Sequence, residues 1–281
     1  MKVNANAKIN LMLDVTGKRD DGFHDVKMIM QTLELCDVIT ADICESGIEL
    51  SGSDSLLEYN ENNLAYRAAV LFFEKSKING GAKIYLEKNI PICAGMAGGS
   101  SDAAAVLCAL NTLYGSPLSE KTLINISAKL GSDVPYCIMK GTALAEGRGE
   151  ILTKIAPFEA ENILIVKPDI GISTPWAYKN LRLSELHHPD VDAAARCIES
   201  KNKAELYSLF ENMFESVVFE HYAEVREIKE SMKKLGADAA LMSGSGPTVF
   251  AIFENKENAE NAYNYFKGKY KQAFLTKTYN P

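Results

Sequence analysis

The chain has 281 residues, of which 47% are hydrophobic and 24% are charged. These values are typical of globular proteins, and a chain of this length buries a core without disulfide bonds or structural metals. Thirty basic residues against thirty-seven acidic residues give a net charge of −7, which excludes the broad basic surface of a nucleic-acid-binding or lipid-binding protein. An anionic ligand needs a local source of positive potential, from a few lysines or from backbone N–H groups at the start of a helix.

The six cysteines show neither a C-x-x-C spacing nor a cluster with zinc-site spacing. We expect them to be free, as in proteins of a reducing compartment. The first ten residues contain Lys and Asn where a signal peptide has an apolar run, and no stretch approaches the roughly 18 apolar residues of a membrane-spanning helix. The sequence predicts a cytoplasmic protein that binds neither membranes nor nucleic acid.

The first half of the chain mixes strands and helices. Apolar residues in alternation or in short runs predict strands over residues 9–13, 26–33, 38–43 and 84–90, and a strand pair within 141–155. Apolar residues at helical spacing predict helices over residues 63–77, 101–113 and 119–130. The helix over 101–113 is almost entirely Ala, Leu and Val, so we expect it to be buried, with Asp102 in an acidic first turn.

The second half opens with a strand, is helical through its middle and ends in a β-β-α-β order. Strands are predicted over residues 162–167, 239–243, 248–253 and 273–278, and helices over 191–199, 203–219, 223–235 and 256–266. Thr174-Pro175 is a helix entry, because proline is tolerated in the first turn. This order predicts the α+β class, with two domains that cover residues 1–157 and 158–281.

The strongest local signal is the glycine-rich stretch over residues 91–105, P-I-C-A-G-M-A-G-G-S-S-D-A-A-A. Its small residues allow a ligand to approach the backbone, and the helix that follows directs free N–H groups and the positive end of its dipole at the loop. It is not a Walker A loop or a dinucleotide-binding fingerprint, since neither motif is present. Phosphate binding and a tight turn that serves packing alone both remain open.

Four other features carry alternatives. The loop over 243–247, S-G-S-G-P, reads as a plain β-turn or as a second ligand loop. Asp133 is a cap or turn aspartate, or a general base. Lys8 lies in an apolar strand, either at an edge or with a buried partner. His24 follows a turn and is either a surface histidine or a ligand contact.

In combination these segments resemble the GHMP small-molecule kinase family, over nearly the whole chain. Three family blocks occur in order, at residues 7–11, 91–101 and 241–247. The resemblance implies a two-domain GHMP kinase fold, with an N-terminal ATP-binding domain like ribosomal protein S5, a ferredoxin-like C-terminal domain, and an active site in the cleft between them.

Further segments narrow the resemblance to family members with a cytidine-diphosphate-linked polyol as acceptor. They lie at residues 16–24, 131–135, 145–150 and 167–175; homoserine-type and mevalonate-type members would not be expected to carry the Gly-Phe-His sequence that ends the first. The implied reaction is ATP-dependent phosphorylation of the 2-hydroxyl of a methylerythritol unit, on the non-mevalonate route to isoprenoid precursors. Another GHMP kinase and a catalytically silent nucleotide sensor are the alternatives; retention of both Lys8 and Asp133 argues against the sensor.

The resemblance also implies roles for individual residues. Asp133 would be the general base, and Lys8 would keep it ionised and stabilise charge on the transferring phosphoryl group. Residues that would bind ATP are Pro91, Ile92, Cys93, Ala94, Gly95, Met96, Ala97, Gly98, Gly99, Ser100 and Ser101, with Asn63 and Lys88 toward the nucleoside. Residues that would bind the acceptor are Asn10, Phe23, His24, Thr174 and Tyr178, with His24 hydrogen-bonded to cytosine and Phe23 and Tyr178 stacked on either side of it. Magnesium is expected without assignable ligands, and the oligomeric state is open.

The chain departs from the family pattern at three places. Phe23 stands where tyrosine is frequent, which keeps a stacking surface and removes a hydroxyl. Cys93, Ala94 and Ala97 replace glycines of the loop, so its backbone has less freedom. Asp102 stands where asparagine is frequent; a negative charge beside phosphates is tolerable only if it faces away or helps to hold magnesium.

Overall fold

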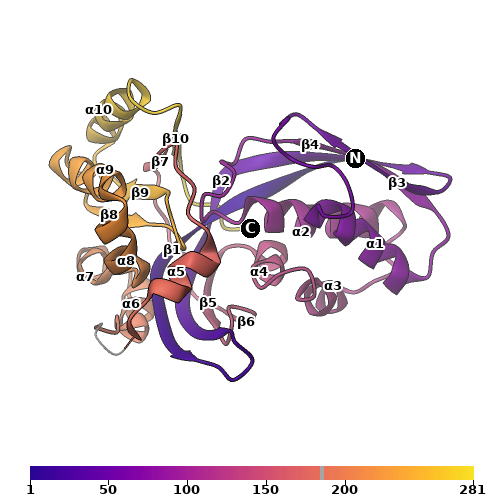
Figure 1. Cartoon of the computed structure of the whole chain (residues 1–281), viewed down its shortest axis with the longest axis horizontal. Helices are drawn as coiled ribbons and strands as arrows, with labels where there is room; N and C mark the ends of the chain where they lie inside the picture. The colour runs from indigo at the N-terminus through magenta and orange to yellow at the C-terminus, as the bar shows by residue number, and fades with distance from the viewer. Residues whose placement is uncertain (184–186) are drawn as a thin grey trace. The chain divides into compact units, whose positions relative to one another are not determined.

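The computed structural model describes residues 1–183 and 187–281, and within them the chain forms two compact units (Figure 1). The first unit comprises Met1–Ala7, Leu35–Ile90 and Ala97–Lys140. The second unit comprises Lys8–Glu34, Pro91–Met96 and Gly141–Pro281. The two units are therefore interleaved along the chain. The division of the sequence at residue 157 stays a prediction.

Two long strands, β1 (Lys2–Lys18) and β2 (His24–Cys44), contribute residues to both units. β1 is buried from Ala5 to Val15 at consecutive positions, so both of its faces are covered and no simple alternation of polar and apolar residues is needed. The sequence predicted two separate strands over 26–33 and 38–43; the structure joins them, because the polar residues between them stay extended.

The first unit contains a β-α-β crossover. The C-terminal part of β2 pairs antiparallel with β4 (Gly81–Glu87), and β4 pairs in parallel with β3 (Gly47–Gly52). Parallel neighbours need a crossover connection, which α1 (Leu64–Ser76) supplies. α1 packs against α2 (Gly98–Leu113), and α4 (Val134–Met139) packs against α2 and α3 (Glu120–Ser127) (Figure 1). The sequence analysis missed β3 and α4, which are only six residues long each.

The buried helix begins earlier than expected. α2 starts at Gly98 rather than at residue 101, and Ala97 is its N-cap in the left-handed conformation. Asp102 therefore lies beyond the first turn, and the prediction of an acidic first turn is wrong. Glycines are poor helix formers and were assigned to the loop, but Gly98 and Gly99 here form the first turn. The helix is buried on nearly all sides, as predicted.

The second unit contains a four-stranded antiparallel sheet in the order β10-β7-β9-β8. Its strands are β7 (Ile163–Lys167), β8 (Ala239–Met242), β9 (Val249–Ile252) and β10 (Gln272–Thr276). α9 (Ala223–Lys234) packs on β8 and β9, and α10 (Lys256–Lys267) packs on β7 and β10. This β-α-β-β-α-β order with the fourth strand beside the first is the ferredoxin-like arrangement, as expected.

The remaining elements of the second unit flank that sheet in sequence. They are β5 (Thr142–Glu146), β6 (Ile151–Lys154), α5 (Thr174–Asn180), α6 (Val191–Glu199), α7 (Lys203–Leu209) and α8 (Phe214–His221). β5 pairs with β6 and with the N-terminal part of β2. The single helix predicted over 203–219 is two helices, because the segment between them pairs with β1: Leu13 N donates to Glu211 O at 3.0 Å, and Met213 N donates to Leu13 O at 3.1 Å.

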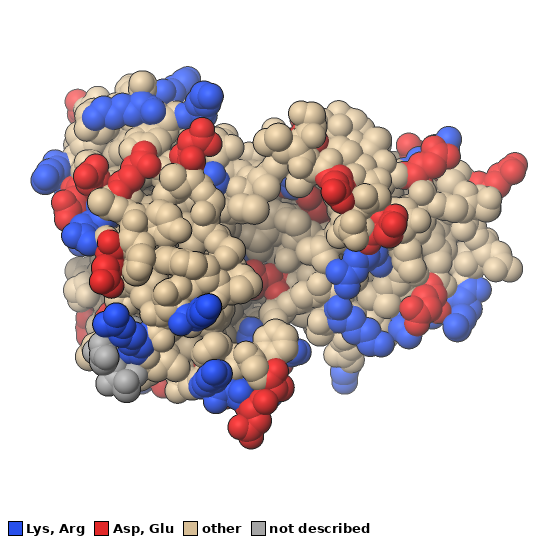
Figure 2. Space-filling model, viewed as in Figure 1, with Lys and Arg blue, Asp and Glu red and all other residues tan. Residues whose placement is uncertain are grey.

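Global properties agree with the composition. All six cysteines are free thiols, as predicted. Within the described ranges no helix is both long and apolar enough to cross a membrane. The face in Figure 2 carries Lys and Arg side chains interspersed with Asp and Glu side chains.

Candidate active site

The glycine-rich loop has an irregular backbone. Cys93, Gly95 and Ala97 have φ angles of 53°, 69° and 57°, in the left-handed region that favours glycine. A residue with a Cβ atom pays of order 1 kcal/mol or more for this conformation. Cys93 and Ala97 therefore hold the loop in a strained shape at the positions where relatives often carry glycine.

The loop contacts the second glycine-rich loop, within the second unit. Ser243 Oγ donates to Gly95 O at 3.0 Å. A Cβ atom built on Gly95 would lie only 2.2 Å from Ser243 O, and one on Gly244 would lie 3.0 Å from Gly95 O. Loop 243–247 is thus packed against loop 91–96 with no room for side chains, which is more than a plain β-turn requires.

Lys8 and Asn10 lie on β1 beside these loops. Lys8 N donates to Met96 O at 3.2 Å, and Lys8 Nζ donates to Asn10 Oδ1 at 2.8 Å. Both side chains are buried, with Lys8 5% exposed. The edge-strand reading of Lys8 is therefore excluded: the ammonium group lies in the interior, next to the glycine-rich loop.

The start of α2 gathers three other predicted segments, within the first unit. A Cβ atom on Gly98 would lie 3.7 Å from Lys88 Nζ, and one on Gly99 would lie 3.7 Å from Leu64 Cδ1, next to Asn63 in sequence. A Cβ atom on Gly131 would lie 3.9 Å from Ser100 Oγ. The segments that carry Lys88, Asn63 and Asp133 therefore surround the first turn of α2.

Asp133 lies at the N-cap position of α4, but in the described chain its side chain makes no capping hydrogen bond. Its backbone carbonyl accepts from Cys137 N at 3.0 Å. The capping function proposed as one reading of this residue is thus carried by the backbone alone, which leaves the carboxylate for another role.

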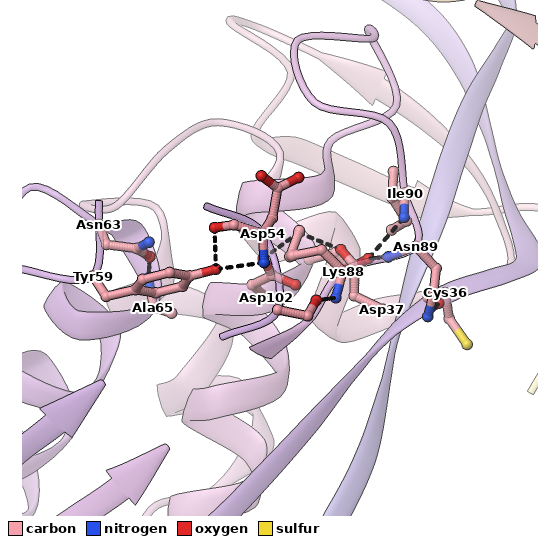
Figure 3. A network of polar contacts seen from close by, with 12 residues as sticks. Cys36, Asp37, Asp54, Tyr59, Asn63, Ala65, Lys88, Asn89, Ile90 and Asp102 are labelled. Atoms are coloured by element: carbon pink, nitrogen blue, oxygen red, sulfur yellow. Dashed lines mark hydrogen bonds and ion pairs between the residues drawn. The ribbon is translucent and has the colours of Figure 1, made fainter. Parts of the chain in front are cut away.

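Lys88 is held between two buried carboxylates (Figure 3). Its Nζ donates to Asp102 Oδ2 at 2.5 Å and also to Asp37 Oδ2. The side chains of Lys88, Asp37 and Asp102 are 5%, 0% and 4% exposed. Asp102 thus faces a cation in the interior, and its Oδ1 has no hydrogen-bond partner among the described residues.

Burial controls the protonation of this cluster. It raises the pKa of Asp102 to about 7, although Lys88 acts in the opposite direction. Burial by itself would lower the pKa of Lys88, but Asp102 and Asp37 outweigh it and the pKa of Lys88 is raised. Near neutral pH the cluster therefore holds a positive Lys88 and an Asp102 carboxyl that is partly protonated.

Asn63 is engaged by its own helix. Its Oδ1 accepts from Ala65 N at 2.9 Å as the N-cap of α1, and its Nδ2 donates to Glu58 O at 2.8 Å (Figure 3). These contacts fix the orientation of the side chain. Contact with a nucleoside stays a prediction for Asn63 and for Lys88.

The residues expected to bind the acceptor form two contacts in the second unit. The rings of His24 and Tyr178 are stacked, with centroids 4.7 Å apart. Phe23 is 53% exposed and lies under the Arg148 guanidinium, whose Cζ is 5.0 Å from the ring centroid. Burial lowers the pKa of His24, and Lys18 contributes in the same direction, so the imidazole is neutral at pH 7.

Thr174 connects α5 to the second glycine-rich loop, since its Oγ1 lies 3.0 Å from Ser245 Oγ. Asn212, which the sequence analysis did not single out, fixes the same loop. Its Nδ2 donates to Met242 O at 2.7 Å and to Gly244 O at 2.8 Å. No local motif marks Asn212, because its partners lie 30 and 32 residues away along the chain.

The family of the chain follows from comparison with known proteins. Residues 63–141 match the model of the GHMP kinases N terminal domain, and residues 183–272 match the GHMP kinases C terminal model. The chain belongs to the GHMP kinase family. It is therefore a kinase that uses ATP as co-substrate and acts on a small molecule.

Relatives within the family match over the full chain. A protein of Lachnoclostridium phytofermentans named 4-diphosphocytidyl-2-C-methyl-D-erythritol kinase is 48% identical, covering 99% of this chain and 97% of its own length. A protein of Clostridium tetani with the same name is 43% identical, covering 99% of this chain and 100% of its own length.

Solved structures agree. A crystal structure of 4-(cytidine 5'-diphospho)-2C-methyl-D-erythritol kinase superposes with a TM-score of 0.87 at 31% identity over 100% of both chains. Mevalonate kinase of L. major, at 15% identity and a TM-score of 0.77 over 99% of this chain and 95% of its own, shares the fold.

Proposed function

We propose that the chain transfers the γ-phosphoryl group of ATP to the 2-hydroxyl of 4-diphosphocytidyl-2-C-methyl-D-erythritol, giving the 2-phosphate and ADP. The identity of 43–48% to full-length relatives of that name supports the acceptor. The structural observation that carries the assignment is the stacked His24–Tyr178 pair, in the segment where the sequence most resembles cytidine-substrate kinases.

The chemistry of the reaction matches the side chains available. Phosphoryl transfer depends on positioning and charge stabilisation more than on covalent participation of the protein. In this proposal the carboxylate of Asp133 accepts the proton of the attacking hydroxyl, and the ammonium of Lys8 keeps Asp133 ionised and stabilises charge on the transferring group. Residues 91–101 bind the ATP phosphates with backbone N–H groups. The burial of Lys8 supports its role, because charge–charge interactions are stronger away from water.

The acceptor site uses neutral donors and aromatic surface. A neutral His24 offers one N–H donor and one lone pair to the edge of a pyrimidine, and Phe23 and Tyr178 supply aromatic faces for the base. Asn10 and Thr174 hold the polyol part. Arg148, above Phe23, adds positive charge to the region that receives a diphosphate-bearing ligand.

Magnesium fits this site as a companion of ATP. Within residues 1–183 and 187–281, no group of three or more His, Cys, Asp or Glu side chains is arranged to hold a metal ion. Magnesium commonly binds through nucleotide phosphates, waters and one or two carboxylates rather than through a protein cage, so the donor set is compatible with it. When bound it neutralises charge on the phosphates.

A coupled ATP-consumption assay tests the proposal. The purified chain is offered 4-diphosphocytidyl-2-C-methyl-D-erythritol, homoserine and mevalonate in parallel. We expect turnover with the cytidine substrate alone. Turnover with homoserine or mevalonate instead would assign the chain to another branch of the family, and no turnover with any of the three would favour a nucleotide sensor.

A further inference from the structure

The glycine-rich loop lacks regular secondary structure between β4 and α2, and Cys93 and Ala97 are strained within it. A strained loop persists only where its surroundings over-determine its shape. The groups that fix both of its ends are therefore part of the phosphate site even though they contact no phosphate.

Asp37 fixes the end at which the chain enters the loop. Its Oδ1 accepts from Asn89 N at 2.5 Å and from Ile90 N at 2.7 Å, and its Oδ2 accepts from Lys88 Nζ. The three donors are consecutive residues directly before Pro91. Asn89 Nδ2 also donates to Cys36 O at 3.1 Å, so the same turn is attached to β2 on both sides of the Asp37 carboxylate (Figure 3).

Lys88 connects this end to the one at which the chain leaves the loop. Its ammonium also donates to Asp102 on α2 at 2.5 Å, and it lies beside Gly98, the first residue of that helix. The ion pairs thus join β2, the segment after β4 and α2 within the first unit. Hydrogen bonds to charged partners are shorter and stronger than neutral ones, and these are fully desolvated.

We infer that Asp37, Lys88 and Asp102 form a buried clamp that holds the two ends of loop 91–97 at the spacing needed for nucleotide phosphates, and that Asp37 is a positioning residue for ATP. The clamp carries two carboxylates on one ammonium, which is costly for a purely structural cluster. The inference rests on the proposed function only in taking loop 91–101 as the phosphate site.

The test uses Asp37→Asn, which keeps the shape of the side chain but replaces one acceptor oxygen by an NH2 group. That group faces either the backbone N–H groups or the Lys88 ammonium, so at least one hydrogen bond is lost. The matched control is Thr142→Val, which removes a buried hydrogen bond from Thr142 Oγ1 to Gln31 Oε1, 2.6 Å in length, outside the clamp. Equilibrium unfolding of both variants provides the comparison of stability.

We expect Asp37→Asn to weaken ATP binding by about tenfold or more, a factor worth about 1.4 kcal/mol, in calorimetric titration of the unreacting protein. We expect the KM for the acceptor to change by less than about threefold. Hydrogen exchange in peptides that span residues 88–101 should become faster in Asp37→Asn and not in Thr142→Val. A second variant, Lys88→Met combined with Asp37→Asn and Asp102→Asn, removes all three charges and should also weaken ATP binding while retaining a native circular dichroism spectrum.

Three results discriminate. A folded Asp37→Asn protein with parental ATP affinity and parental exchange in residues 88–101 would overturn the clamp. Equal weakening of ATP binding by the equally destabilised Thr142→Val would also overturn it, because the effect would then follow stability alone. If the parent protein binds ATP but does not phosphorylate the cytidine substrate, the acceptor assignment fails, while the binding and exchange measurements still decide the clamp.

Discussion

The ring of His24 lies on the ring of Tyr178, with the centroids 4.7 Å apart and the planes inclined by 25°. His24 belongs to the start of β2 and Tyr178 to α5, so residues 154 positions apart meet at one place in the second unit. Stacking fixes the direction of the imidazole nitrogens, which a specific hydrogen bond to a base requires.

Replacement of His24 by alanine should raise the KM for the cytidine substrate by about tenfold or more and leave the KM for ATP nearly unchanged, because one hydrogen bond and one stacked ring are lost at the acceptor site. Steady-state kinetics with each substrate varied in turn provide the measurement. His187→Ala is the control, since that side chain is 79% exposed. An unaltered KM for the acceptor would remove His24 from the cytosine site.

Replacement of Asp133 by asparagine should lower kcat by at least about a hundredfold, the usual contribution of a general base, while ATP still binds. Single-turnover kinetics and calorimetric titration with ATP separate the two effects. Asp190→Asn is the control, because Asp190 caps α6 through its side chain and asparagine caps equally well. Comparable turnover in Asp133→Asn would show that this residue is not the base.

Replacement of Gly95 by alanine should strongly destabilise the protein, because the added methyl group would lie 2.2 Å from Ser243 O at a φ of 69°. Gly99→Ala is the matched control in the next turn of chain: its Cβ meets Leu64 Cδ1 at 3.7 Å, an ordinary contact, and alanine favours the helix by about 1 kcal/mol. Thermal unfolding should show a lower Tm for Gly95→Ala and an equal or higher Tm for Gly99→Ala. Equal Tm values for the two variants would contradict the packing of the two loops.

Replacement of Ala97 by glycine should stabilise the protein by about 0.5–1 kcal/mol, because relief of the left-handed conformation outweighs the added freedom of the unfolded chain. Ala104→Gly, in the interior of α2, should lower stability by about 1 kcal/mol. Denaturant titration measures both. A loss of stability in Ala97→Gly would mean that the strain at this position is negligible.

The sequence identified the glycine-rich loop and the buried helix after it because their chemistry is local. Small residues and an alanine-rich run are visible without knowledge of the fold. The clamp was not visible, because Asp37 and Lys88 are 51 residues apart along the chain and Asp37 stands in an ordinary β-like sequence. The break between α7 and α8 was missed for the same reason: it results from pairing with β1, and no proline or glycine marks it.

The pH dependence of stability should report the Asp102 carboxyl. Its pKa rises from an ordinary 3.8 to about 7 in the folded protein, so between these values the native state holds a proton that the unfolded chain has released. The contribution of this group to stability is therefore present below about pH 4 and declines as the pH rises to about 7. Asp37 and Lys88 are the charged groups that face it, and Lys88, with a raised pKa, stays positive across this range.

Replacement of Asp102 by asparagine should flatten this dependence. The Tm of the variant relative to the parent should increase between pH 5 and pH 8, measured at constant ionic strength. The Asp190→Asn variant, whose carboxylate is at an exposed helix end, serves again as the control and should parallel the parent. Parallel profiles for Asp102→Asn and the parent would show that Asp102 does not titrate in this range.

The interleaving of the two units has a consequence for synthesis on the ribosome. All segments of the first unit have been made once Lys140 emerges, whereas residues 8–34 belong to a unit that is complete only at Pro281. Ile9, Leu11 and Ile29, each fully buried in the finished protein, must therefore wait for the C-terminal half of the chain before they are covered. The nascent polypeptide thus presents an apolar segment for chaperones throughout the later part of translation.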